Sequence, residues 1–299
     1  MAWPPMIGAF PGVGLTGSLV GPSAARALRA GATGRVGAVF ERSLYLALDS
    51  GWIAVGGPGL GGGPLNLVCA PGPDAPLSAI VAPGAAVRIT ASACQAGSLT
   101  VAIAGVTAWR PAPVGAWTKA SLAHGLAAVG DVVRQCRPAA SGLIGHVFPE
   151  LGPVLPAAAA PLRRLSEMLA GARFDPGAIV PLIGLGPGLT PSGDDYLGGV
   201  LVALALTARL PLRDRLWQAL VPGLGERTSA ISAAHLAAAA EGFGCAALHE
   251  VLGALLTGAG DRLPAAVAAL ARVGHTSGWD ALAGAIAALR VVGDDLAAR

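Results

Sequence analysis

The sequence of 299 residues predicts an α+β protein. A β-rich N-terminal domain is expected over residues 1–110, and an all-helical C-terminal domain that carries a glycine-rich signature over residues 111–299. Before Trp109-Arg110-Pro111, short valine-rich runs alternate with Gly/Pro turns, and after Pro111 apolar residues recur at helical spacing. The chain is 54% hydrophobic and 12% charged, so it can bury a sizeable core and is not disordered.

The β-rich part is expected to form a mostly antiparallel sheet or a small barrel, from runs at 34–48, 52–57, 65–69, 86–93 and 98–106. The glycine-rich connection at 56–66 keeps two interpretations, a loop that approaches a ligand or a loop that is only mobile. Residues 89–109 carry no charge and are long enough to span a bilayer. They are interpreted as two β-rich runs around a turn at Ala96-Gly97, so no membrane partner is predicted.

One glycine pattern has the spacing of a dinucleotide-binding fingerprint, at Gly12, Gly14 and Gly17. That fingerprint needs a preceding strand, a following helix and an acid about twenty residues further on. The residues before it contain Pro4 and Pro5, and Glu41 is expected within a strand rather than at its end. The pattern is therefore not taken as a nucleotide site.

Helices are expected over 118–136, 157–171, 191–209, 212–221, 227–240, 244–256, 262–272 and 278–291. Thr190 before Pro191 predicts an N-cap followed by a first-turn proline. Ser277 and Asp280 have the spacing of a capping box. No tandem repeat of fixed period is evident.

Charge and cysteine usage exclude several classes of function. The net charge of +3 without a basic run indicates no nucleic-acid partner. The N-terminus lacks the basic segment of a secretory signal, so a cytoplasmic protein is expected. Four widely spaced cysteines favour buried reduced thiols over disulfides or zinc ligands, namely Cys69, Cys94, Cys136 and Cys245. His124, His146 and His249 lack metal-ligand spacing, so neither structural zinc nor a cofactor is predicted.

The stretch LIGLGPGLTPSGDDYLGG, residues 182–199, is the strongest candidate for a site. Gly186 and Gly188 permit positive φ and a close approach of the backbone to a ligand. Thr190 and Ser192 add hydroxyl groups at the start of the following helix, where free N–H groups and the positive dipole end favour an anion. The stretch therefore predicts a site for a small anionic substrate.

Asp194 and Asp195 follow this loop. A favourable interaction with the helix dipole explains one acid, but adjacent acids on a helix point in different directions. The segment after them is apolar nearly all round, so at least one carboxylate is expected to face the glycine loop and to serve as a hydrogen-bond acceptor or general base. Whether the pair binds a metal stays open.

Two later segments are candidates to line the same site. Thr228, Ser232 and His235 recur at helical spacing with Ser229 beside them, and either line a cleft or pack small residues between helices. VGHTSGWDALAG, residues 273–284, brings Ser277 and Asp280 to a helix start, which is a second anion site or simple capping. His275 is interpreted as structural.

GLGPGLTPSGDDYLGG resembles the signature of a bacterial family, catalogued as a domain of unknown function, that includes the AllH subunit of oxamate carbamoyltransferase. ERTSAISAAHLAAAAEGF and GHTSGWDALAG resemble its later elements, and GRVGAVFERSLYLAL and GGGPLNLVC its N-terminal strands. The resemblance implies carbamoyl transfer between phosphate and a small carboxy-amide of the oxalurate/oxamate type, in nitrogen or purine catabolism such as allantoin degradation. It also implies partner subunits.

The resulting hypothesis places Asp194, Asp195 and His235 in catalysis, and assigns substrate or anion binding to Gly186, Gly188, Thr190, Ser192, Thr228, Ser229 and Ser277. The Ser-Thr-Arg-Thr run of aspartate and ornithine carbamoyltransferases is absent, and ERTS at 226–229 only partly matches it. The alternative is a non-catalytic subunit that binds a small anion or metabolite within a multi-protein complex.

Overall fold

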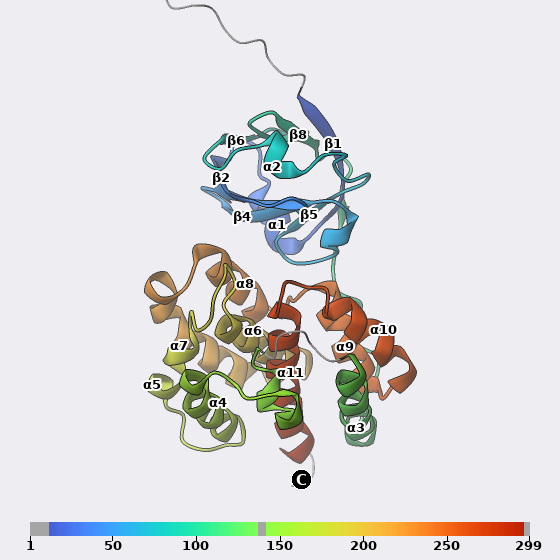
Figure 1. The fold of residues 1–299 in the computed structure, drawn as a ribbon, viewed down its shortest axis with the longest axis vertical. Helices are drawn as coiled ribbons and strands as arrows, with labels where there is room; N and C mark the ends of the chain where they lie inside the picture. The colour runs from blue at the N-terminus through green and yellow to red at the C-terminus, as the bar shows by residue number, and fades with distance from the viewer. Residues whose placement is uncertain (1–11, 137–141, 296–299) are drawn as a thin grey trace, which may run out of the picture. The chain divides into compact units, whose positions relative to one another are not determined.

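The computed structural model describes residues 12–136 and 142–295, which divide into two compact units between Arg110 and Pro111 (Figure 1). The first unit is β-rich and the second is helical, so the predicted α+β class is confirmed.

The first unit is a closed barrel. Its strands lie in the order β5-β4-β3-β2-β6-β7-β8-β1, and antiparallel pairing of β1 with β5 closes the sheet. The two-residue strand β9 pairs with the end of β1. Most neighbours are antiparallel, but β4 with β5, β1 with β8 and β1 with β9 are parallel. The strands are β1 Val13–Val20, β2 Thr33–Val39, β3 Ser43–Leu48, β4 Gly51–Gly56, β5 Asn66–Cys69, β6 Ala86–Ile89, β7 Ala93–Ala96, β8 Leu99–Ala102 and β9 Thr107–Ala108. The expected small barrel is confirmed.

Two strand expectations were wrong in detail, and one strand was not expected. The run at 34–48 is a hairpin of β2 and β3 whose turn contains Glu41, because the Phe40 N–H bonds to the Ser43 carbonyl. The run at 86–93 breaks after Ile89, since the Thr90 hydroxyl caps a turn by accepting the Ala93 N–H. Strand β1 was not expected, because its glycines obscured the alternation of apolar residues.

The dinucleotide pattern lies on this unexpected strand. Gly14 and Gly17 belong to β1, and a Cβ atom at Gly17 would lie 3.0 Å from the carbonyl oxygen of Ala102. Glycine there lets neighbouring chain segments approach, so the pattern has a packing explanation.

Buried aliphatic side chains fill the barrel, among them Leu44, Leu46, Ile53, Leu67, Leu99 and Val101. All four cysteines are free thiols. Cys69 and Cys94 are buried in this core, and burial raises their pKa to about 11 and about 12, so both thiols are protonated and unreactive at neutral pH. Cys136 and Cys245, in the helical unit, are half-buried rather than buried.

The helical unit contains every helix expected from the sequence. Its helices are α3 Lys119–Cys136, α4 Pro156–Leu169, α5 Pro176–Ile179, α6 Ser192–Leu206, α7 Leu210–Arg227, α8 Ala230–Ala240, α9 Ala246–Thr257, α10 Leu263–Leu270 and α11 Ser277–Asp295. The short α5 was not expected, nor were α1 Pro22–Ala27 and α2 Leu77–Ile80 of the first unit. Helix α7 continues through Pro222, where the sequence predicted its end, because packing of Leu216, Leu220 and Leu224 holds its apolar face. None of the helices described is long and apolar enough to cross a membrane.

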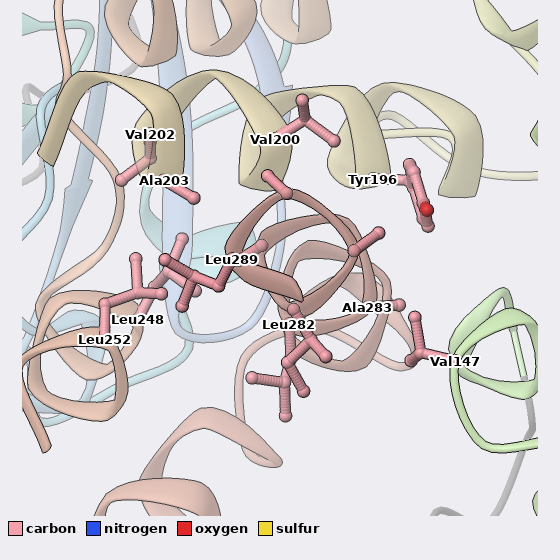
Figure 2. Close-up of a cluster of buried hydrophobic side chains, with 14 of the residues drawn as sticks. Val147, Tyr196, Val200, Val202, Ala203, Leu248, Leu252, Leu282, Ala283 and Leu289 are labelled. Carbon is pink, nitrogen blue, oxygen red and sulfur yellow. The ribbon is translucent and has the colours of Figure 1, made fainter. Parts of the chain in front are cut away.

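Helices α6 and α11 pack against each other at the centre of this unit. Figure 2 shows Tyr196, Val200 and Ala203 of α6 beside Leu282, Ala283 and Leu289 of α11, and all of these side chains are buried. The helices can approach closely because Gly199 and Gly284 lie at the crossing: a Cβ atom on either would lie 1.9 Å from a carbonyl oxygen of the other helix. This crossing fixes the relative position of the two helix N-termini.

Candidate functional site

Helix α6 begins differently from the sequence expectation. The N–H groups of Asp194 and Asp195 donate to the Pro191 carbonyl at 2.9 and 3.1 Å, so Pro191 is the N-cap and has no side chain that can cap. The predicted Thr190 cap was wrong. The hydroxyl of Thr190 instead hydrogen-bonds that of Ser277 at 3.1 Å, which links the start of α6 to the start of α11.

The glycine loop has the backbone conformation that its glycines permit. Gly186 and Gly188 have φ values of 115° and 95°, in the left-handed region that favours glycine. Their N–H groups have no hydrogen-bond partner among the residues that the structure describes. The loop therefore presents free donors next to the N-terminus of α6, as an anion site requires.

Asp194 joins three segments of the chain and is almost completely buried, with 2% of its surface exposed. Its Oδ1 accepts the Gly184 N–H at 2.9 Å. Its Oδ2 accepts hydrogen bonds from the Ser232 hydroxyl at 2.7 Å and from the Thr228 hydroxyl. Both oxygens are satisfied, so this carboxylate fastens the glycine loop and the start of α8 to α6.

The Asp195 carboxyl is not part of the Asp194 network, and it makes fewer hydrogen bonds. It is partly exposed as a residue, but its Oδ2 atom is buried without a hydrogen-bond partner in the described part of the chain. Burial is the main cause that raises the pKa of this carboxyl to about 8. Hydrogen bonds with the Ser277 and Thr190 hydroxyls lower the pKa, and the charges of Asp280 and Asp194 raise it. At neutral pH the Asp195 carboxyl is therefore mostly protonated, and it can donate a proton.

Asp280 lies in a segment that was expected to line the site, but the sequence assigned it neither catalysis nor substrate binding. Its side chain is fully buried, and its Oδ1 accepts the Leu143 N–H at 2.5 Å. Its Oδ2 is buried without a partner among the described residues. Burial raises the pKa of Asp280, against the effect of the Leu143 N–H and of the neighbouring hydroxyls of Ser192 and Thr276.

The capping box expected at Ser277 and Asp280 was wrong. Ser277 is the first residue of α11, and the Asp280 N–H donates to the Thr276 carbonyl at 2.9 Å, so Thr276 precedes the helix as its cap. The Asp280 carboxyl bonds to Leu143 from a distant segment rather than to the first turn of its own helix.

The stripe at 228–235 does not lie on a single helix. Helix α7 ends at Arg227 and α8 begins at Ala230, so Thr228 and Ser229 form the connection. The Ser229 hydroxyl accepts the Ser232 N–H at 3.0 Å and donates to the Leu189 carbonyl at 2.6 Å. The connection is thus fastened to the glycine loop as well as to Asp194.

The histidines lie outside this network. No hydrogen bond in the described residues joins His235 to Asp194 or Asp195, and burial lowers the pKa of His235 to about 4, so its ring is neutral. His249 accepts the Gly244 N–H through Nε2, and burial also lowers its pKa to about 4. His275 is exposed before α11.

A hollow of about 280 Å³ lies at the opposite end of α6 from these carboxyl groups. Leu204, Ala208, Arg209, Leu212 and Val292 are among its lining residues, which include no carboxylate or histidine. This lining offers few groups that could bind or react with a polar substrate. The N-termini of α6 and α11 are therefore the better candidate for a functional site.

The sequence contains a pattern that could have identified Asp280 as a site residue. The pattern Ser-Gly-x-Asp-x-Leu-x-Gly occurs as SGDDYLGG at the start of α6 and as SGWDALAG at the start of α11. Asp195 and Asp280 are equivalent in this alignment, as are the crossing glycines Gly199 and Gly284. The repeat is separated by many residues and has no tandem period, so a search for regular repeats does not detect it.

The arrangement can bind and transfer protons. It combines two carboxyl groups of raised pKa, four hydroxyl groups and the free N–H groups of a glycine loop at converging helix N-termini. Among the residues that the structure describes, no group of three or more His, Cys, Asp or Glu side chains could hold a metal ion.

One family model matches the chain, over residues 182–289, and its family is described as oxamate carbamoyltransferase subunit AllH. The match runs from the glycine loop through most of α11, so it includes Asp194, Asp195 and Asp280. No solved structure matches the chain.

Proposed function

We propose, from the match of residues 182–289 to the family model of the oxamate carbamoyltransferase subunit AllH, that this chain is a subunit of a carbamoyltransferase acting on a small carboxy-amide. The proposed reaction moves a carbamoyl group between phosphate and oxamate, with oxalurate as the carbamoylated form. A phosphate oxygen attacks the carbamoyl carbon of oxalurate, and the bond from that carbon to the amide nitrogen breaks. The products are carbamoyl phosphate and oxamate, whose nitrogen has gained one proton.

Asp195 is proposed as the source of that proton. The observation that carries the proposal is the raised pKa of its partly buried carboxyl. A carboxyl with a pKa of about 8 is protonated at neutral pH but still releases its proton readily, as a general acid requires. Its Oδ2 is buried and has no hydrogen-bond partner in the described residues, so a substrate nitrogen placed beside it would satisfy it. In the reverse direction the Asp195 carboxylate takes a proton from the attacking amide of oxamate.

The substrate's negatively charged end is assigned to the glycine loop. The free N–H groups of Gly186 and Gly188, with the positive end of the α6 dipole, favour a carboxylate or phosphate. The Thr190 hydroxyl bonds to that of Ser277, and the Ser192 hydroxyl bonds to that of Thr276. These hydroxyls can rotate to donate to such an anion.

The remaining candidates are assigned to supporting roles. Asp194, with Thr228, Ser229 and Ser232, holds the loop in place rather than reacting, because both of its oxygens already accept hydrogen bonds. His235 is not assigned to the reaction, since it is outside the network described above. We also propose that the chain acts with partner subunits in the cytoplasm, in nitrogen or purine catabolism.

The test is phosphorolysis of oxalurate by the chain coexpressed with the partner subunits of its own complex, with carbamoyl phosphate measured as product. Asp195→Asn should lower the rate by about 100-fold or more, because it removes the proton donor while it keeps the shape. Asp214→Asn is the matched control, since Asp214 is an exposed acid on α7, and it should leave the rate unchanged. A complex without phosphorolysis contradicts the reaction, and an Asp195→Asn complex as fast as the parent contradicts the role of Asp195.

The alternative is a non-catalytic subunit that binds a small anion. The satisfied hydrogen bonds of Asp194 favour it, because they show that part of the signature serves structure. If Asp195→Asn changes only the affinity for oxamate or oxalurate and not the turnover rate of the complex, this alternative is correct.

A further inference from the structure

The starts of α6 and α11 make equivalent contacts with each other. A Cβ atom at Gly199 would lie 1.9 Å from the Ala281 carbonyl oxygen, and one at Gly284 would lie 1.9 Å from the Tyr196 carbonyl oxygen. Ala281 and Tyr196 occupy the same position in the two copies of the repeated pattern. The crossing is therefore reciprocal, and it places the two helix starts in equivalent surroundings.

The hydroxyl groups follow the same exchange. Ser277 of α11 lies against the Asp195 carboxyl of α6, and Ser192 of α6 lies against the Asp280 carboxyl of α11. Each serine also meets a threonine that precedes the other helix, in the pairs Thr190–Ser277 at 3.1 Å and Ser192–Thr276 at 3.4 Å. The two carboxyl groups are thus built as a pair.

Each carboxyl of the pair keeps one buried oxygen without a partner among the described residues, Oδ2 of Asp195 and Oδ2 of Asp280. A buried oxygen of this kind destabilises the folded protein unless a donor reaches it. Two acceptors on neighbouring carboxyl groups match a group with two N–H bonds on one nitrogen. When both carboxyl groups are ionised, a second carboxylate or a phosphate in the same place would be repelled.

We propose that Asp195 and Asp280 together bind the –NH₂ end of a primary amide, with one N–H donated to each Oδ2. This inference rests on the proposed function and deepens it, because it assigns the two ends of a carboxy-amide such as oxamate. The –NH₂ end lies at the carboxyl pair, and the carboxylate end lies at the glycine loop. When Asp195 gives its proton to the departing nitrogen, the new N–H is the one that it then accepts.

Asp280→Asn tests this assignment sharply. The Leu143 N–H donates to Oδ1 of Asp280, so in the variant this N–H holds the amide oxygen of the asparagine in the same place. The asparagine –NH₂ then stands where Oδ2 was and presents donors instead of an acceptor. The variant should therefore weaken the preference of the site for an –NH₂ group without a change in shape.

The measurement is the affinity of the full chain for oxamate and for oxalate, by titration calorimetry at pH 9, where the Asp195 carboxyl is ionised and accepts hydrogen bonds. Oxalate has the same outline with an oxygen in place of –NH₂. The parent chain should bind oxamate about tenfold or more tightly than oxalate, and Asp280→Asn should lower that ratio by about tenfold or more. The control Asp214→Asn should keep the parent's ratio. An unchanged ratio in Asp280→Asn, or a parent that prefers oxalate or binds neither ligand, overturns the inference.

A second measurement covers the case in which Asp280→Asn does not fold. N,N-dimethyloxamate lacks both N–H bonds, so the parent chain should bind it about tenfold or more weakly than oxamate, and equal binding overturns the inference. The outcome is separable from that of the proposed function. Phosphorolysis with an unchanged ratio contradicts only the carboxyl pair, and selective binding of oxamate without phosphorolysis contradicts only the reaction.

Discussion

Gly284 touches the backbone of Tyr196 so closely that a Cβ atom on it would lie 1.9 Å from the Tyr196 carbonyl oxygen. Gly199 meets Ala281 in the same way from the other helix. These two contacts set how near α6 and α11 come, and thereby how the carboxyl groups at their N-termini are paired. The chemistry of the site depends on two residues that have no side chain.

The first prediction concerns this crossing. Gly199→Ala should lower the free energy of unfolding by about 1–3 kcal/mol or more, because the added methyl group forces the helices apart. Gly198→Ala is the matched control on the same helix, since its Cβ would lie 3.8 Å from the Ala239 Cβ in ordinary contact. It should be neutral or stabilising by up to about 1 kcal/mol through helix propensity. Equal stabilities of the two variants in urea unfolding would contradict the close crossing.

The second prediction separates the adjacent aspartates. Asp194→Ala should lower the free energy of unfolding by about 3–5 kcal/mol, because it leaves the Gly184 N–H and two hydroxyls without their acceptor. Ser232→Ala, which removes one donor and leaves the carboxylate two others, should cost about 1 kcal/mol. Thermal and urea unfolding of both variants measure this. An Asp194→Ala protein as stable as the parent would mean that this carboxylate does not fasten the loop.

The third prediction is a pH dependence of stability. The folded-state pKa of Asp195, about 8, lies above the unfolded value of about 4, so between these pH values only the folded state holds the proton. The contribution of this carboxyl to stability is therefore fully present below about pH 4 and is lost as the pH rises to about 8. Relative to Asp195→Asn, the parent should lose stability over this range and stay level above it.

Melting temperatures of the two proteins from pH 4 to 9 give the difference directly, and shifts due to His235 and His249 cancel because both proteins contain them. Asp280 has a raised pKa as well and remains in both proteins. A difference that stays constant with pH, or that grows in favour of the parent as the pH rises, would show that Asp195 titrates like an ordinary carboxyl.

Much of the fold follows from local patterns. Periodicity and turn residues indicate the helices of the second unit and the strand-rich first unit, because the burial of apolar faces decides both. Strand β1 escapes prediction, since its glycines serve contacts with distant strands rather than a local preference. Pro222 predicts a helix end that does not occur, because tertiary packing stabilises α7 beyond this residue.

The candidate site is predictable only in part. The glycine loop and the adjacent acids are visible in the sequence, because glycine, a helix start and charge in an apolar segment each have a local meaning. The roles of the acids depend on partners far along the chain. Thr228 and Ser232 satisfy Asp194, and the distance of Asp280 from Asp195 in sequence hides their relationship. Local rules assigned capping to Thr190 and Ser277, whereas the crossing of the helices turns both hydroxyls toward each other.

The central claim is that the Asp195 carboxyl holds a proton near neutral pH and is the group poised to transfer it. The most direct test is a ¹³C NMR titration of the full chain with labelled aspartate carboxyl carbons, in which the Asp195 signal is assigned by its absence from Asp195→Asn. We predict a midpoint near pH 8 for this signal. A midpoint near pH 4, the ordinary value for an aspartate, would contradict the claim.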